Sequence, residues 1–202
     1  MELLSPAKDL ETLICAFDAG ADAVYAGLTK FSARARAKNL TIEELYKSVE
    51  IKKKINKKLY IALNTLIFEE EIPELIEILI HLKSAGIDGI IIQDYGIYQL
   101  MKDFGIDIPL HTSTQMGTKN HLQAKFLEDL GFKRVILERQ LSLDEIKSIR
   151  NHTNIELEVF VHGAMCFALS GHCFFSKMLG NRSGNRGDCA QPCRWSFRDI
   201  TN

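Results

Sequence analysis

The sequence lacks the segments that direct a chain into a membrane or out of the cell. It does not begin with a basic stretch followed by an apolar one, and no run reaches the roughly 18 apolar residues of a membrane-spanning helix. We therefore expect a soluble, cytoplasmic protein. The formal net charge is only -1 and the pI is about 6.6, so the chain is not a polycation. Binding of an anion would need a local basic patch.

Several cofactor-binding and catalytic motifs are also missing. No G-x-G-x-x-G follows the first expected strand, which disfavours a dinucleotide-binding Rossmann fold. H-E-x-x-H and G-x-S-x-G do not occur, so neither a zinc-protease motif nor a serine nucleophile elbow is present. The cysteines number five, and no secretion signal precedes them, so metal or redox chemistry is favoured over a framework of disulfide bonds.

What the chain does contain, up to about residue 163, is a repeated pattern of helix, glycine and short apolar run. Clear copies carry Gly20, Gly86 or Gly131 where a helix would end and release the chain into a strand. The seven expected strands are Glu2–Leu4, Ala23–Tyr25, Leu59–Leu63, Gly89–Ile92, Leu110–Thr112, Arg134–Leu137 and Glu156–Val161. Strands that alternate with helices pair in parallel through right-handed crossovers. We therefore predict an α/β fold, a TIM-like (β/α)8 barrel, complete or incomplete.

We expect a single domain with two parts. Residues 1–163 would form the barrel core, and residues 164–202 would form a segment rich in Cys, Arg and Gly that packs over the barrel mouth. The total length is about that of one large domain, which agrees with this division.

Mostly polar residues follow the expected strands, where a barrel builds its active face. They are Ser5, Gly27, Asn64, Gln93, Asp94, Ser113, Gln115, Glu138, Arg139, His162 and Gly163. Solvated loops are polar in any protein, so only the whole ring indicates a site. From it we select His162 and Glu138 as candidate catalytic residues. Asn64, Gln115 and Arg139 are candidate substrate-binding residues.

Four cysteines lie close together near the end of the chain, with the spacing C-x6-C-x15-C-x3-C. They are Cys166, Cys173, Cys189 and Cys193. Clustered thiols in a reducing compartment indicate zinc or an iron–sulfur cluster, whereas free core cysteines are the plainer alternative. Only Cys189–Cys193 resembles a zinc knuckle, so the spacing favours the iron–sulfur cluster, and His162 or His172 could replace one thiol. Cys15 lies next to the apolar stripe of the first expected helix and is predicted to be a small buried side chain.

A tandem G-N-R sequence separates the second and third of these cysteines and carries Arg182 and Arg186 four residues apart. With three further basic residues they outnumber the single Asp188 between positions 177 and 198. Guanidinium groups bind phosphate and carboxylate in a bidentate manner, so we select both arginines as candidate substrate-binding residues. A solvated surface loop is the alternative. Trp195 and Phe197 either stack on a base or belong to a core.

Seven blocks of this sequence resemble the U32 peptidase family. They are E-L-L-S-P-A (2–7), D-A-V-Y-A-G (22–27), H-T-S-T-Q-M (111–116), L-E-R-Q-L-S (137–142), E-V-F-V-H-G-A-M-C (158–166), S-G-H-C-F-F-S (170–176) and G-N-R-S-G-N-R-G-D-C-A-Q-P-C-R (180–194). The resemblance implies a TIM-barrel-type protein in which the four cysteines fall on a motif that holds a 4Fe-4S cluster. Family members are usually longer, which implies a further C-terminal domain or a partner subunit.

The resemblance implies two activities, proteolysis of the collagenase type and hydroxylation of RNA bases or quinone rings. Because no nucleophile elbow or hydrolytic metal motif is present, hydroxylation is favoured. We expect a base of tRNA, such as a uridine, or of rRNA to be the substrate, and a carboxylate such as prephenate to be the oxygen donor. A peptidase in which His162 activates Cys166 is the alternative. An accessory protein with a structural metal cluster, iron–sulfur or zinc, is a third.

Overall fold

Seven parallel strands form one curled sheet in the computed structural model, which describes residues 1–34 and 37–198. The strands are neighbours in chain order: β1 (Leu4–Ala7), β2 (Ala23–Gly27), β3 (Lys58–Leu63), β4 (Gly89–Ile92), β5 (Leu110–Thr112), β6 (Arg134–Ile136) and β7 (Glu156–Glu158). A hydrogen-bonded ladder joins each strand to the next, but among these residues none joins β7 to β1. The predicted TIM-like barrel with parallel strands is confirmed in its incomplete form, with a seam between the first and last strands.

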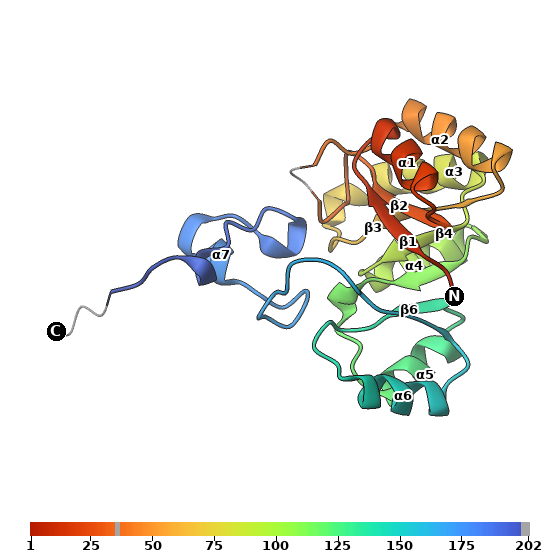
Figure 1. The fold of residues 1–202 in the computed structure, drawn as a ribbon. Helices are drawn as coiled ribbons and strands as arrows, with labels where there is room; N and C mark the ends of the chain where they lie inside the picture. The colour runs from red at the N-terminus through yellow and green to blue at the C-terminus, as the bar shows by residue number, and fades with distance from the viewer. Residues whose placement is uncertain (35–36, 199–202) are drawn as a thin grey trace.

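Helices connect the strands and lie on the outer side of the curled sheet (Figure 1). They are α1 (Leu10–Asp18), α2 (Ile42–Lys54), α3 (Ile72–Ala85), α4 (Tyr95–Asp103), α5 (His121–Asp129) and α6 (Leu143–His152). Three of them, α1, α2 and α6, begin at capping boxes, in which Asp9 pairs with Thr12, Thr41 with Glu44 and Ser142 with Glu145. Each pair satisfies backbone N–H groups that have no partner inside the helix.

The two faces of the sheet are packed differently. Successive residues of a strand point to opposite faces, so Leu59, Ile61 and Leu63 face the helices and belong to the large core of the protein. Tyr60 and Ala62 face inward and belong to a much smaller cluster inside the barrel. The apolar core therefore lies between sheet and helices, and the barrel interior has room for polar groups.

At the N-terminal ends of the strands the interior is filled by an ion-pair network around Arg134. The side chain of Arg134 is 8% exposed and contacts three carboxylates, at 2.8 Å to Glu2, 2.7 Å to Glu156 and 3.2 Å to Glu158. The hydroxyl of Tyr60 donates a hydrogen bond to Glu2 at 3.0 Å. Because Glu2 precedes β1 and Arg134 begins β6, the network spans the open side of the barrel.

The network shifts the ionisation of its members. Burial alone would raise the pKa of Glu2, but hydrogen bonds from Lys58 and Arg134 outweigh it and lower this pKa to about 2. Burial raises the pKa of Glu158, against the opposing effect of Arg134. Burial lowers the pKa of His111 to about 4, and the positive charge of Arg134 acts in the same direction. His111 is therefore a neutral side chain inside the barrel at pH 7.

The first and last strands differ most from those expected from the sequence. The first strand runs from Leu4 to Ala7 and includes Pro6, which is tolerated because β1 lies at an edge of the sheet and pairs on one side only. The last strand ends at Glu158. The apolar residues Val159–Val161 that follow are exposed, between 42% and 87%, because no strand lies beside them on the seam side.

The prediction that Cys15 is buried was wrong. The buried residues of α1 are Leu13 and Phe17, which face the sheet from successive turns, and Cys15 lies midway between them in sequence. Two residues along a helix correspond to about 200° of rotation, so Cys15 faces solvent, where the structure places it.

The C-terminal segment begins after β7, on the side of the barrel where the strands have their C-terminal ends. It contains α7 (Phe175–Gly180) and two 3-10 turns, η3 (Gly184–Arg186) and η4 (Pro192–Arg194). Figure 1 shows its first part along the barrel and the region of α7 standing away from it. The division into residues 1–163 and 164–202 remains a prediction. No helix in the two described ranges is both long and apolar enough to cross a membrane.

Candidate functional site at the barrel mouth

The barrel mouth is the end of the interior at the C-terminal ends of the strands, and uncharged or acidic side chains line it. Gln93 directly follows β4, and Glu138 is the second residue after β6. They lie two residues beyond Ile91 and Ile136 of the inner cluster. The alternation of a strand therefore places both on the inner side. Gln93 is 8% exposed and Glu138 is 2% exposed. Two polar side chains thus lie buried at the top of the barrel interior.

Most of the buried polar atoms without a partner are at this end. In the described part of the chain, six buried side-chain atoms lack a hydrogen bond: Asn39 Oδ1, Thr65 Oγ1, Gln93 Oε1, Gln115 Oε1, Arg139 Nε and, deeper in the barrel, His111 Nδ1. Each unsatisfied group costs on the order of 1–3 kcal/mol of stability. Such a concentration is typical of a site that is satisfied by something other than the protein itself.

A turn at Ser170 and Gly171, called here the Ser170–Gly171 turn, closes the mouth from above. The backbone N–H of Ser170 donates to Glu138 Oε1 at 2.9 Å, and Arg139 Nη2 donates to the hydroxyl of Ser170 at 2.8 Å. Glu138 was predicted to be catalytic, and Arg139 to bind substrate. In this arrangement both side chains hold the turn on the barrel.

Gly171 fits where a larger residue would not. Its φ is +77°, and a Cβ on it would lie 2.2 Å from the carbonyl oxygen of Gln115 and 3.0 Å from Nε2 of Gln93. A side chain would clash with backbone, and the left-handed conformation favours glycine. The turn therefore rests directly on the two glutamines. Gln115 was among the predicted substrate-binding residues.

Gln93 and Thr65 were not selected from the sequence as site residues, although Gln93 was in the predicted ring. The signal that could have found Gln93 is its position immediately after a buried strand, which it shares with the selected Asn64. Thr65 stands one residue further from its strand. Its importance is visible only from its burial, because Thr65 is 2% exposed.

Asn64 organises a neighbouring loop. Its Oδ1 accepts a hydrogen bond from the backbone N–H of Ala33 at 2.9 Å, and Arg34 Nη1 donates to the carbonyl of Ala7 at 3.0 Å. A Cβ on Gly27, at the end of β2, would lie 2.2 Å from the hydroxyl oxygen of Ser32. The loop after β2 is thus pressed onto the rim of the mouth, and Asn64 holds part of it.

Arg186 of the tandem G-N-R sequence fastens the C-terminal segment to the barrel. Its guanidinium donates to the carbonyl of Leu66 and to Glu71 Oε1, both at 2.6 Å, and lies 4.8 Å from the centre of the Phe68 ring. A cavity of about 400 Å³ lies beside this contact, between the loops that follow β2 and β3. Its lining includes Arg186 and the unpartnered Thr65.

Arg182 is bound within its own loop. Its Nε donates to the carbonyl of Asp188 at 3.2 Å and lies 3.4 Å from Asp188 Oδ1. Both arginines predicted to bind substrate are therefore engaged by the protein itself. Their role toward a substrate remains a prediction.

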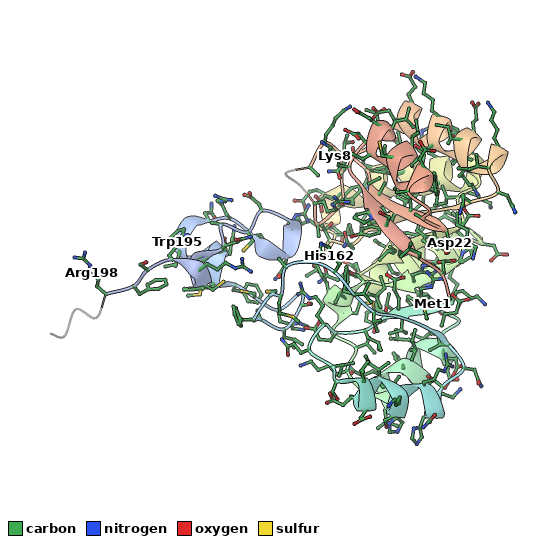
Figure 2. The ribbon with its side chains drawn as sticks, in the orientation of Figure 1. Met1, Lys8, Asp22, His162, Trp195 and Arg198 are labelled. Carbon is green, nitrogen blue, oxygen red and sulfur yellow. The ribbon has the colours of Figure 1, made fainter. Side chains whose placement is uncertain are left out.

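His162 marks the place where the chain leaves the barrel, whereas Trp195 and Arg198 lie far out on the projecting part (Figure 2). His162 is exposed and forms no hydrogen bond to any other described residue. Nor does a hydrogen bond join a cysteine thiol or serine hydroxyl to a histidine ring anywhere in residues 1–34 and 37–198. The arrangement does not assemble a cysteine–histidine or serine–histidine pair.

The cysteines lie on two stretches that contact each other. Arg194 Nη2 donates to the carbonyl of Met165 at 3.2 Å, and the N–H of Ala190 donates to the hydroxyl of Ser176 at 2.9 Å. Cys166, Cys189 and Cys193 are exposed, and Cys173 is half-buried. The described residues contain no group of three or more His, Cys, Asp or Glu side chains that could hold a metal ion. In this arrangement the four thiols are not gathered into one group, and the metal that they hold stays a prediction.

Comparison with known proteins places the chain in a family. The family model described as peptidase family U32 matches residues 8–202. The chain is 46% identical, over 99% of its length, to an uncharacterized protease of Methanocaldococcus jannaschii, and covers 50% of that protein. It is 40% identical over 98% of its length to the 23S rRNA 5-hydroxycytidine C2501 synthase of Escherichia coli, and covers 30% of it. It is 39% identical over 97% of its length to tRNA hydroxylation protein P1 of Bacillus subtilis, and covers 46% of it.

The fold agrees with this relationship. The solved structure of a U32 peptidase superimposes with a TM-score of 0.69, covering 83% of this chain and 71% of that one at 18% identity. The chain spans half or less of the length of the three relatives. On the match of the family model and the identity over nearly all of its length, the chain belongs to peptidase family U32.

Proposed function

We propose that this chain is the barrel-forming part of a protein that hydroxylates a base in RNA. The observation that carries the proposal is similarity, at 39% and 40% identity over 97% and 98% of the chain, to relatives named for tRNA hydroxylation and for the synthesis of 5-hydroxycytidine in 23S rRNA. The barrel mouth supports it, because its unpartnered amides offer neutral hydrogen-bonding groups of the kind that recognise bases. The substrate would be a tRNA or an rRNA.

Peptide hydrolysis is less favoured, in spite of the family's name. A peptidase of this kind needs a nucleophile next to a base that activates it. His162 and Cys166 are both exposed, and no hydrogen bond joins them. Glu138, the buried carboxylate of the mouth, is occupied by the N–H of Ser170.

The proposal also includes a cofactor and an oxygen donor. We propose that the four cysteines supply ligands to a 4Fe-4S cluster, with zinc as the alternative, and that a carboxylate such as prephenate donates the oxygen. Their spacing supports metal binding, whereas the described arrangement does not gather the thiols. A partner subunit or a further C-terminal domain would complete the assembly.

The activity can be tested in cells that lack the gene. Mass spectrometry of nucleosides from purified tRNA and rRNA should show one hydroxylated nucleoside disappearing and its precursor, one oxygen atom lighter, taking its place. A plasmid copy of the gene should restore it. Unchanged RNA, together with cleavage of casein or gelatin that Cys166→Ala abolishes, would support the peptidase instead.

The cofactor has a separate test. Protein purified without oxygen should be brown and contain iron and inorganic sulfide, and Cys166→Ser or Cys173→Ser should bleach it. Cys15→Ser is the matched control, because Cys15 is an exposed thiol on α1, outside the cysteine segment. A colourless protein with stoichiometric zinc would contradict the cluster.

A further inference from the structure

We propose that the amides of Gln93 and Gln115 form a binding site for the hydrogen-bonding edge of a pyrimidine base in RNA, and that the Ser170–Gly171 turn covers this site until the base enters. The inference rests on the proposed function and deepens it, because it names the groups that would recognise the base. It concerns binding, so it can be tested without measuring hydroxylation.

The first observation is a buried side chain without partners. Gln93 is 8% exposed, and its side chain forms no hydrogen bond with any other described residue, its Oε1 being fully enclosed. The Oε1 of Gln115 is enclosed and unpartnered as well. A buried amide is normally satisfied by the protein or by ordered water. Gly171 lies against the side-chain amide of Gln93 and the backbone carbonyl of Gln115, so two residues with unpartnered amides meet the same turn. This arrangement indicates a site that is complete only with a ligand.

The second step is the chemistry of the amide. A glutamine amide presents one donor and one acceptor side by side, which matches an edge that has one acceptor and one donor. Cytosine offers N3 as acceptor and its amino group as donor, and uracil offers a carbonyl as acceptor and N3–H as donor. Rotation of the amide by about 180° exchanges its two groups, so the same side chain suits either base. A carboxylate or a guanidinium in this place would suit only donors or only acceptors.

The third observation is what covers the amides now. The Ser170–Gly171 turn lies against the side-chain amide of Gln93 and the backbone of Gln115. It is held by the hydrogen bonds from its own N–H to Glu138 and from Arg139 to its hydroxyl. A base in a duplex or stacked strand reaches an enzyme pocket only after it leaves the stack and enters an enclosed site. Withdrawal of the turn would open this pocket and free Glu138 and Arg139 to face the base.

The cover lowers the apparent affinity, because only the molecules with an open mouth bind. Arg139 Nε, unpartnered in the closed mouth, would become available to a carbonyl or phosphate oxygen of the nucleotide. The closed mouth therefore leaves amides without partners, and the open mouth with a base bound satisfies them. The turn and the base compete for one place.

The experiment uses the 202-residue chain and two fluorescein-labelled nonauridylates, one unmodified and one methylated at every N3. Methylation removes the donor of the edge and blocks access to it. Fluorescence anisotropy should show the unmodified RNA binding roughly 10-fold or more tightly, the discrimination expected for one two-point contact to a base. Equal affinity of the two RNAs would overturn the proposal.

The variant Gln93→Met tests whether Gln93 causes the difference in affinity between the two RNAs. Methionine has nearly the shape of glutamine without its hydrogen-bonding groups, so this variant should bind both RNAs with the same affinity. Gln99→Met is the matched control, because Gln99 is a glutamine on α4 whose amide bonds to Asp103 on the surface. It should keep the discrimination of the wild type. A Gln93→Met protein that still discriminates 10-fold would assign the edge contact elsewhere and overturn the proposal.

Gly171→Ala tests the cover. The added methyl cannot fit against Gln115, so the turn should be displaced and the affinity for unmodified nonauridylate should rise several-fold. Gly131→Ala is the control, since Gly131 also has positive φ, +92°, but has open space around it. Unchanged or weaker binding by Gly171→Ala, with discrimination retained by the wild type, would remove the cover from the proposal.

The two proposals fail in different ways. If cells lacking the gene keep every hydroxylated nucleoside but the chain distinguishes the two RNAs through Gln93, the base site stands and the reaction is wrong. If the nucleoside is lost but the chain does not distinguish the RNAs, the reaction stands and the base site is wrong.

Discussion

The two ends of the barrel interior are built on opposite principles. At the N-terminal end, Arg134 is surrounded by Glu2, Glu156 and Glu158, and each charge has a partner. At the mouth, neutral amides and a guanidinium nitrogen are buried without partners. Among the buried atoms without a partner in the described part of the chain, His111 Nδ1 lies deeper in the barrel than the others.

On this comparison, the N-terminal end of the barrel interior serves stability and the mouth serves function. A buried ion-pair network is expensive to assemble and more expensive to break, because the loss of one member leaves its partners charged and desolvated. Unpartnered polar groups cost stability in every molecule that carries them. A chain that satisfies one end and leaves the other unsatisfied has kept its hydrogen-bonding capacity where a ligand can use it.

The largest effect is expected from removing Arg134. Arg134→Met removes the buried guanidinium that three carboxylates share. The free energy of unfolding, measured by urea denaturation, should therefore fall by about 3–5 kcal/mol. Lys125→Met removes an exposed lysine that pairs with Glu128 and Asp129, and should cost less than about 1 kcal/mol. Equal losses in the two variants would mean that the N-terminal end is not the stabilising one.

The next effect is a loss of stability in acid. As pH falls from 6.5 toward 4, histidine becomes protonated in the unfolded chain while buried His111 stays neutral, so unfolding is favoured by up to about 3 kcal/mol. Below pH 4.5 the lowered pKa of Glu2 adds a second loss that continues toward pH 2. In His111→Phe the change between pH 6.5 and 4 should be smaller, as followed by thermal unfolding across this range. The same slope in both proteins would contradict the assignment.

A smaller, local effect is expected from Glu138. Glu138→Ala leaves the N–H of Ser170 without its acceptor, which should cost about 1.5–3 kcal/mol in the closure of the turn. Hydrogen exchange at the Ser170 amide should therefore become at least about 10-fold faster. Glu138→Gln retains an acceptor and should change the exchange much less. Slow exchange in the alanine variant would show that other contacts hold the turn.

The smallest effect is expected from Gln93, although this residue is buried. Replacing an unpartnered amide with an apolar side chain of similar shape removes a desolvation cost, so Gln93→Met should leave stability unchanged or raise it by about 1 kcal/mol. Denaturation under the conditions used for Arg134→Met gives a direct comparison. A loss of about 2 kcal/mol would show that the amide has a structural partner, and the contrast between the two ends would disappear.

The fold could be predicted from the sequence because parallel strands buried on both faces are short apolar runs bounded by glycine. Gly86 ends α3 with φ of +78°, as the pattern predicts. The largest errors in strand bounds fall at the seam, where β1 and β7 each have one neighbour and the pattern of a buried strand no longer applies. Pro6 inside β1 and the exposed Val159–Val161 are examples.

From the sequence, the site could be predicted only as a ring of residues that follow the strands. Asn64, Gln115, Glu138 and Arg139 are near the mouth because the C-terminal ends of parallel strands meet at one edge of a sheet. The sequence does not tell which of them the protein uses for itself. That depends on contacts between distant segments, such as Ser170 with Glu138, 32 residues apart, or Arg186 with Glu71, 115 apart.

The sequential order of the strands has a consequence for how the chain acquires its structure. Each strand pairs with the one made just before it, so the sheet can grow strand by strand during synthesis. The ion pair between Arg134 and Glu2 joins residues 132 apart and forms only when β6 has been made. Until then Glu2 and the first strands lie at an edge of the sheet without their later partner Arg134. Formation of the ion pair between Arg134 and Glu2 should mark the point at which the growing sheet takes its barrel shape.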